Sequence, residues 1–215
     1  YPLKDVSDFE VGAVLLFSWI KVSGVTKNGV ANSTTIEYNA VTERYFTPFV
    51  NKLRSVLAGV EGNSLQTERD KFNFLAVENF KFMNYAMRSL SGGEKVLQIV
   101  LQPKISKPRI TLAGHVLFRT ILSLARLAIL TDRELIVIED GERGGEKRGT
   151  RYGGRWQYIP LKNITGTSLL DREDNLLVLS LALVPTGRQV EFIFDVTKRQ
   201  ELFQLRDEIE KLMGK

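Results

Sequence analysis

The chain contains no cysteine and a single histidine, His115, among its 215 residues. Without cysteine there is no disulfide, no thiolate zinc site and no cysteine nucleophile. A lone histidine with no carboxylate near it in the sequence lacks the partners that a metal site or a catalytic triad requires. We therefore expect a structural role for His115, and the absence of cysteine fits a reducing compartment.

The sequence also lacks an uninterrupted apolar run of membrane-spanning length. The most apolar stretch, residues 112–130, contains His115, Arg119 and Arg126. A spanning helix needs about 20 mainly apolar residues, and an arginine near its centre costs about 2.5 kcal/mol or more. We interpret this stretch as soluble core. No signal peptide is visible, although upstream targeting stays open because the sequence begins at Tyr1, and we expect a cytoplasmic protein.

Nucleotide-binding motifs are missing as well. The glycine-rich, basic segment 140–155 lacks both the GK[ST] ending of a P-loop and the G-x-G-x-x-G spacing of a dinucleotide site. We expect a long hairpin loop there, since one Arg-Gly-Gly triplet is weak evidence for RNA binding. The acidic cluster Asp171, Glu173 and Asp174 is too short for a calcium loop, and we expect a charged turn.

Positive charge is concentrated in the middle of the chain. The net charge is +5, and residues 91–156 carry twelve basic side chains against seven acidic ones. Such a field attracts phosphates, anionic lipid or nucleic acid. The alternative is an ordinary solvated basic surface.

Two distant segments of the chain resemble each other. The sequence PLKDV (residues 2–6) matches PLKNI (residues 160–164). Apolar runs centred on Ser18 and Ser180 follow as expected strands, and STTIEYNAV (33–41) then parallels GRQVEFIFDV (187–196). Each copy ends in an amphipathic helix. We therefore predict an internal repeat, with the chain beginning partway through the first copy.

The two helices have recognisable ends. The second is expected after an N-cap at Thr197, with a core-facing stripe of Leu202, Leu205, Ile209 and Leu212. The first is expected to begin near Thr47, because Pro48 belongs in a first turn, and to stop at Gly59. Its expected core stripe comprises Phe46, Phe49, Val50, Leu53, Val56 and Leu57.

Between the copies, residues 63–90 show helical periodicity. Apolar residues recur at spacings of three and four, which predicts one linker helix ended by Gly92 and Gly93. Its broad aromatic face suggests that it packs on a domain. The expected organisation is half of a first domain over residues 1–60, a linker helix over 61–91 and a complete domain over 92–215.

The second copy has additional strands before the repeated part. Residues 94–103 alternate, residues 124–132 and 134–142 suggest a hairpin, and residues 152–164 suggest a further strand. Several short strands followed by one C-terminal amphipathic helix predict an α+β fold. The expected architecture is an antiparallel curved sheet or open barrel capped by that helix.

This order of elements resembles a pleckstrin-homology-like (PH-like) domain, particularly the bacterial type. The resemblance is carried by LAILTDRELIVIEDGE, RWQYIPLKNITGTSL, LLVLSLAL, QVEFIFD and the terminal helix KRQELFQLRDEIEKL. It covers residues 95–215 fully and residues 1–59 as the back half of another copy. It implies a seven-stranded, barrel-like sandwich closed by a helix, and binding rather than catalysis. The family hosts many functions, so fold alone does not settle the role.

The resemblance also indicates candidate binding residues. Many lipid-binding members of the wider family carry a basic K-x(n)-[KR]-x-R pattern between their first two strands, and this chain has Lys104, Lys107 and Arg109 there. Lysine supplies a mobile charge and arginine a bidentate fork for phosphate. Loops at one end of such a barrel lie close together, so we expect a second basic group to join them: Arg143, Lys147, Arg148 and Arg151.

The function expected first is a non-enzymatic protein-interaction or assembly module of a prokaryotic cytoplasm, acting through strand edges and the aromatic linker. The alternative is binding of an anionic membrane or phosphate headgroup through the basic loops, which salt should weaken. No motif places a carboxylate pair or a nucleophile with its base, so we expect no enzyme, cofactor, metal or small-molecule substrate. Charge alone leaves nucleic-acid binding open, but the bases would need aromatic platforms on the basic face, so we do not expect nucleic acid as the partner.

Overall fold

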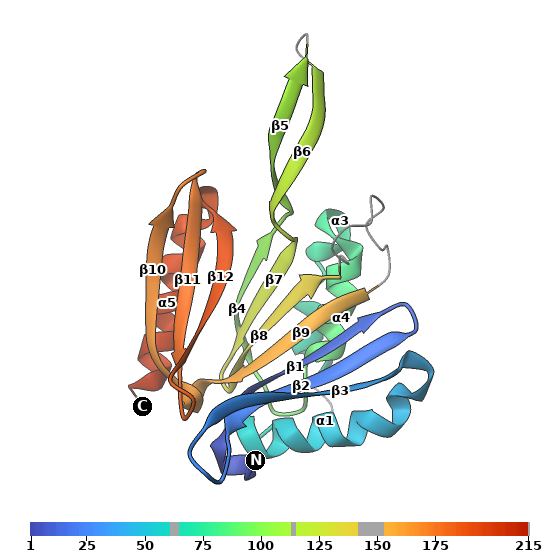
Figure 1. The fold of residues 1–215 in the computed structure, drawn as a ribbon, viewed down its shortest axis with the longest axis vertical. Coiled ribbons are helices and arrows are strands. Elements are labelled where there is room, and N and C mark those ends of the chain that lie inside the picture. Colours follow the sequence, from blue (N-terminus) through green and yellow to red (C-terminus); the bar gives the residue numbers. More distant parts are fainter. Residues whose placement is uncertain (61–64, 113–114, 142–152, 215) are drawn as a thin grey trace.

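The computed structural model describes residues 1–60, 65–112, 115–141 and 153–214. The fold is mixed α+β, with antiparallel open sheets and a C-terminal helix, as the sequence predicts (Figure 1). The first part comprises η1 (Leu3–Asp5), β1 (Val6–Val14), β2 (Phe17–Val25), β3 (Ala31–Asn39), η2 (Ala40–Thr42), α1 (Glu43–Ala58), α2 (Gln66–Asp70), α3 (Leu75–Glu78) and α4 (Phe80–Ser89). The second comprises β4 (Val96–Gln102), β5 (Ile105–Leu112), β6 (His115–Ser123), β7 (Arg126–Thr131), β8 (Glu134–Asp140), β9 (Gly153–Pro160), η3 (Leu161–Asn163), β10 (Ile164–Arg172), β11 (Leu176–Leu183), β12 (Arg188–Asp195), η4 (Val196–Lys198) and α5 (Arg199–Met213).

Strands from both repeats form one seven-stranded sheet, in the order β3-β2-β1-β9-β8-β7-β4. The two repeats meet where β1 pairs with β9, from Phe9 opposite Tyr158 to Val14 opposite Gly153. Two smaller sheets accompany it, β10-β11-β12 and the hairpin β5-β6. The first repeat therefore extends the sheet of the second by edge pairing.

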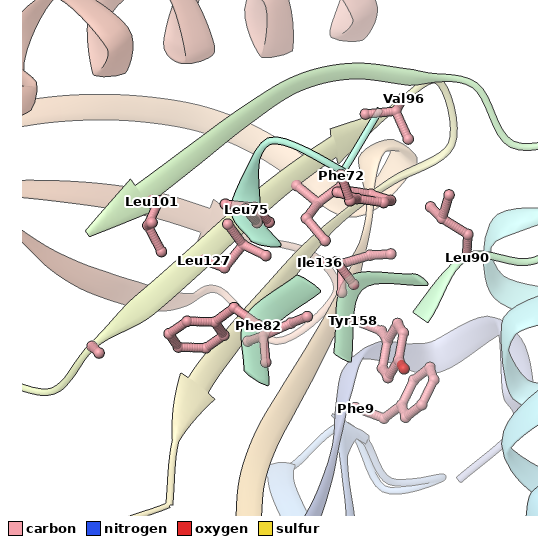
Figure 2. Close-up of a cluster of buried hydrophobic side chains, with 14 of the residues drawn as sticks. Phe9, Phe72, Leu75, Phe82, Leu90, Val96, Leu101, Leu127, Ile136 and Tyr158 are labelled. Atoms are coloured by element: carbon pink, nitrogen blue, oxygen red, sulfur yellow. The ribbon is translucent and has the colours of Figure 1, made fainter. Parts of the chain in front are cut away.

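The seven-stranded sheet is buried on both faces where β7 and β8 lie. On one face, Ile136 and Ile138 pack with residues of α1 and of the α2–α4 segment (Figure 2). On the other, Leu135 and Val137 pack with β11, β12 and α5. Double-sided burial explains why these strands are uninterrupted apolar runs rather than alternating ones.

The two repeats fold alike in detail. Each runs from a 3₁₀ turn into a strand with a register shift, between Val6 and Asp8 in β1 and between Ile164 and Gly166 in β10. Before its helix, each repeat has an Asx turn in which a side chain accepts from the backbone N–H two residues later, at Asn39 and at Asp195. The repeat prediction thus matches the element order.

The strand register differs from the sequence alignment. Ile20 pairs with Ile36 in the first repeat, and Leu179 pairs with Phe192 in the second. Matching these pairs aligns Ser18 with Leu177 rather than with Ser180. Strand pairing therefore shows which residues of the two repeats are equivalent, which a match between short apolar runs does not.

Both repeat helices begin differently from the prediction. Helix α1 begins at Glu43 and contains Pro48, although we expected the proline in the first turn. Thr197 is not the N-cap of α5: it lies in the 3₁₀ turn η4, which Asp195 caps, and the residue before α5 is Lys198. The predicted stop at Gly59 is confirmed by its left-handed φ of 69°.

The predicted core-facing apolar residues of these two helices differ in how far they are buried. In α5, Leu202, Leu205 and Ile209 are buried as predicted. In α1, only Leu53 and Leu57 of the expected apolar stripe are buried, whereas Phe49 and Val56 are exposed.

The prediction of one continuous linker helix is wrong. Residues 65–90 form α2, α3 and α4 instead. Asn79, with φ −160° and ψ 87°, separates α3 from α4, and its side-chain oxygen accepts from the N–H of Phe82. This break allows Phe72 and Phe82 to enter the same core, where they are fully buried (Figure 2).

Across the helices in the described ranges, none combines the length and apolarity that crossing a membrane would require.

Candidate functional site

A β-hairpin formed by β5 and β6 projects beyond the packed layers of the protein (Figure 1). Its strands pair with each other, for example Lys107 with Thr120 and Pro108 with Arg119. It continues from β4 and returns into β7, so it is an extension of that strand pair. We call residues 103–123 the arm. The arm contains four Lys or Arg residues and no acidic residue.

The arm exposes large apolar side chains. Leu117 is 52% exposed, Phe118 59% and Ile121 45%. The sequence favours soluble core for residues 112–130, because arginines interrupt the apolar run. That interpretation holds for β7, which is buried throughout, but not for these three residues of β6. Exposed large apolar side chains that are close in the sequence make this part of β6 a candidate binding surface.

Three predicted site residues lie at the arm. Lys104 precedes β5, and Lys107 and Arg109 are exposed residues of that strand. The Nζ atom of Lys107 lies 2.6 Å from Oδ2 of Asp174 in the turn between β10 and β11. Both side chains are well exposed, so the ion pair is worth about 0–1 kcal/mol and is readily exchanged for another anion.

The other predicted basic residues, Arg143, Lys147, Arg148 and Arg151, lie outside the described residues. Strand direction nevertheless locates the chain on either side of them. Strands β4 and β8 both run antiparallel to β7, so both end at the same end of the sheet. The arm leaves β4 there, and residues 141 and 153 flank the other basic segment at that end.

A second exposed apolar group lies toward the same end. It consists of Phe74, Val77 and Phe80, which are 51%, 95% and 63% exposed, and we call it the α3 patch. The ion pair between Lys81 and Asp140 fixes the start of α4 against the end of β8. The arm and the α3 patch therefore occupy the same end of the seven-stranded sheet (Figure 1).

A cavity of about 450 Å³ lies on the sheet face opposite α1, lined mainly by β1–β3, β8 and β9. Trp19 lies over Gly12, where a Cβ atom would be only 2.0 Å from the indole. The Nε1–H of Trp19 donates to Oε1 of Glu10 at 2.7 Å. Gly12 is thus required for the position of this aromatic wall.

Charges alternate across the strands beside this cavity. Arg126 pairs with Glu139, whose other oxygen lies 2.7 Å from Nη2 of Arg155. Arg155 in turn lies 3.5 Å from Glu10. Burial lowers the pKa of Arg126, and Glu139 opposes that shift. The sequence did not indicate this network, because it depends on the pairing of β7 with β8, of β8 with β9 and, for Glu10, of β1 with β9.

A second cavity, of about 360 Å³, opens between α1, α4 and the sheet, lined among others by Tyr38, Tyr85 and Trp156. The Tyr85 hydroxyl donates to the carbonyl of Gly153 at 3.2 Å and accepts from its N–H at 3.3 Å.

A charged cluster is buried between α1 and the second repeat. Arg54 of α1 lies 2.8 Å from Glu94, and its Nε–H donates to Glu134 at 2.9 Å. The guanidinium lies 4.7 Å from the centre of the Tyr158 ring. Burial raises the pKa of Glu134 to about 7, with Arg54 opposing and Glu94 reinforcing the rise. One arginine thus faces two buried carboxylates.

This cluster is the carboxylate pair that no sequence motif indicated. Both carboxylate side chains have no exposed surface and are fastened to Arg54, and neither lines the two cavities described above. General acid or base chemistry requires the group to reach a substrate. We therefore assign the cluster to holding α1 against β8.

The remaining predicted positions have structural neighbours. Asp171 pairs with Arg199, and its pKa is lowered by the hydrogen bond from that guanidinium. Asp174 and Asn175 adopt left-handed φ angles of 63° and 57° in the tight turn between β10 and β11, as expected for a charged turn. Among the described residues, no group of three or more His, Asp or Glu side chains is arranged to hold a metal ion.

No protein-family model matches the chain, and no curated protein matches its sequence.

Proposed function

We propose that this protein is a non-enzymatic, PH-like binding module that docks on anionic membrane surfaces through the arm. The PH-like assignment is supported by the element order of the second repeat. Strands β4 and β7–β9, then β10–β12, then α5 give two packed antiparallel sheets and a terminal helix. That is the order the sequence resemblance implies. The proposed location is peripheral, at a cytoplasmic membrane face.

The observation that carries the proposal is the composition of the exposed arm. Basic side chains at a membrane surface gain about 1 kcal/mol each from anionic lipids. Exposed apolar side chains such as Leu117 and Phe118 gain a further contribution on entering the interfacial region, about 25 cal/mol per Å² buried. The arm has no acidic residue that anionic lipids would repel. The electrostatic and the apolar contribution therefore both favour binding of the arm.

A specific observation favours a second function, the protein-interaction or assembly module expected first from the sequence. The α3 patch exposes Phe74, Val77 and Phe80 without a covering element in the described structure. Aromatic side chains are enriched at protein interfaces, so this exposed patch with its two phenylalanines suits a protein partner. This function is compatible with membrane docking.

Vesicle co-sedimentation tests the membrane proposal. Wild-type protein is expected to bind phosphatidylserine-containing vesicles strongly at low salt, less at about 0.15 M salt, and not to bind neutral phosphatidylcholine vesicles. The variant with Lys104, Lys107 and Arg109 changed to Ala is expected to bind about 100-fold more weakly at low salt, from about 1 kcal/mol per removed charge.

Two further variants separate the contributions. Changing Leu117 and Phe118 to Ser should preserve low-salt binding but abolish binding at physiological salt. A control with the same charge removed elsewhere, Lys162, Arg172 and Lys211 to Ala, uses exposed residues of the second repeat and should bind like wild type. Equal loss in this control, or equal binding of wild type to both vesicle types, would refute docking by the arm.

A further inference from the structure

The seven-stranded sheet ends in an open strand edge at β3. Eight of the nine residues of β3 are exposed, and the ninth, Tyr38, is half-buried. Natural edge strands are usually protected by proline, lysine, a bulge or a covering element. Strand β3 contains neither proline nor lysine, its only charged residue is Glu37, and its register with β2 is unbroken. Such an edge is suited to pairing with another strand.

The opposite edge of the sheet, β4, is covered. The side-chain amide of Gln98 donates to the carbonyl of Glu201 in α5 at 2.7 Å. Gln102 accepts from the backbone N–H of Asp195 at 2.8 Å. These contacts place α5 and the end of β12 beside β4, which hinders head-to-tail pairing of this edge with β3 of a second copy. The edge that a second copy can offer is its own β3.

Helix α1 exposes an apolar stripe beside this edge. Val41, just before the helix, and Tyr45 and Phe49 within it recur every four residues and are 74%, 67% and 42% exposed. The Phe46 ring stacks on Tyr38 with centroids 4.0 Å apart, which fixes α1 along β3 (Figure 1). Ile36, on the same strand face as Tyr38, is 43% exposed.

Antiparallel pairing of β3 with itself is chemically self-complementary. With the two-fold axis at Thr35, Glu37 faces Ser33 and Ile36 faces Thr34, so no like charges meet. An axis perpendicular to the sheet keeps both α1 helices on the same face. The two apolar stripes, Val41, Tyr45 and Phe49, then approach each other from the two copies. One interface would thus pair the free backbone hydrogen-bonding groups of the β3 edge and cover the exposed apolar side chains of α1.

The molecule already uses this type of contact internally. Its two repeats are joined by antiparallel edge pairing of β1 with β9, over the six residue pairs from Phe9–Tyr158 to Val14–Gly153. Pairing at β3 would continue the same sheet into the next copy.

We propose that the protein forms a two-fold symmetric homodimer by antiparallel pairing of β3 with β3 of a second copy, centred on Thr35, with the α1 stripes packed together. This dimer closes on itself, because each copy contributes its one open main-sheet edge among the described strands. The proposal does not depend on membrane docking, since it uses neither the arm nor the α3 patch.

The test is the molar mass of the intact chain in solution, measured by sedimentation equilibrium without lipid. Wild type is expected to be a dimer at micromolar concentration. Thr35→Lys and Thr35→Glu each place like charges opposite each other at the axis and should weaken dimerisation at least about tenfold. An equal mixture of the two variants should restore the dimer, because lysine then faces glutamate.

The control is Thr165→Lys, an exposed strand threonine of the second repeat, which should leave the dimer intact. Far-ultraviolet circular dichroism should show that all variants keep the fold, since Thr35 is exposed. A molar mass of one chain for the wild type at about 100 µM overturns the proposal. The β3 edge would then be left to another partner. A dimer that survives Thr35→Lys alone also overturns it.

Discussion

Residues 91–215 produced without the first 90 residues are expected not to fold cooperatively. Five side chains of their strands, Leu127, Ile129, Ile136, Ile138 and Tyr158, belong to a core completed by β1, α1 and the α2–α4 segment (Figure 2). Exposing a large apolar side chain costs about 1.5–3 kcal/mol, so the five together cost about 7–15 kcal/mol. That loss equals the whole stability of a typical domain, about 5–15 kcal/mol.

Urea unfolding followed by circular dichroism, together with binding of the dye ANS, measures this effect. The intact chain should unfold in one sharp transition and bind little dye, whereas residues 91–215 should show a broad transition and strong dye binding. Co-expression with residues 1–90 should restore the sharp transition. A sharp transition in residues 91–215 alone would contradict this expectation and would fit the complete domain that the sequence predicts over residues 92–215.

Replacing Arg54 by Met is expected to destabilise the protein by about 3–5 kcal/mol, because two buried carboxylates lose their shared cation. Although burial disfavours the charged guanidinium, Glu134 and Glu94 hold the pKa of Arg54 above its ordinary value, so the residue remains charged in the native cluster. Methionine has a similar apolar stem, which limits the loss of packing. Chemical denaturation at pH 7 would measure the change in the free energy of unfolding.

Glu134→Gln is the matched control for this experiment. It keeps an oxygen acceptor for Arg54 and leaves one carboxylate, Glu94, facing one guanidinium. We expect a loss of about 1 kcal/mol or less. If Arg54→Met were no more destabilising than Glu134→Gln, the cluster would not be what holds α1 against β8.

Much of the second repeat could be predicted from local patterns. The strands around Ile129 and Ile136 are short apolar runs bounded by turn residues, and Leu202, Leu205 and Ile209 have helical spacing. These signals depend only on neighbours in the sequence. They correctly gave an α+β fold of antiparallel strands with a C-terminal helix.

The joining of the repeats could not be predicted in the same way. The pairing of Phe9 with Tyr158 brings together residues far apart in the chain, and no local pattern specifies which edges meet. The contact of Arg155 with Glu10 depends on that pairing, and the cluster around Arg54 depends on the packing of α1 against the second repeat. The linker break was locally detectable in principle, because Asn79 is a good N-cap residue three positions before Phe82.

The candidate site was predicted only in its basic half. Lys104, Lys107 and Arg109 matched a family pattern, and the structure places them at the projecting arm. Leu117 and Phe118 fall in the stretch 112–130, which is interpreted as soluble core because its arginines disfavour a membrane span. Sequence periodicity alone does not distinguish a buried strand from a projecting hairpin.

One measurement tests arm docking most directly. Because the chain has no cysteine, Phe118→Cys gives a single site on the arm for a polarity-sensitive fluorophore, and Glu208→Cys on α5 gives a control. With phosphatidylserine vesicles at low salt, where binding is expected to persist without the Phe118 side chain, the label at position 118 should shift to the blue while the label at position 208 does not. If neither label shifts although the protein sediments with the vesicles, the arm is not the element that enters the membrane.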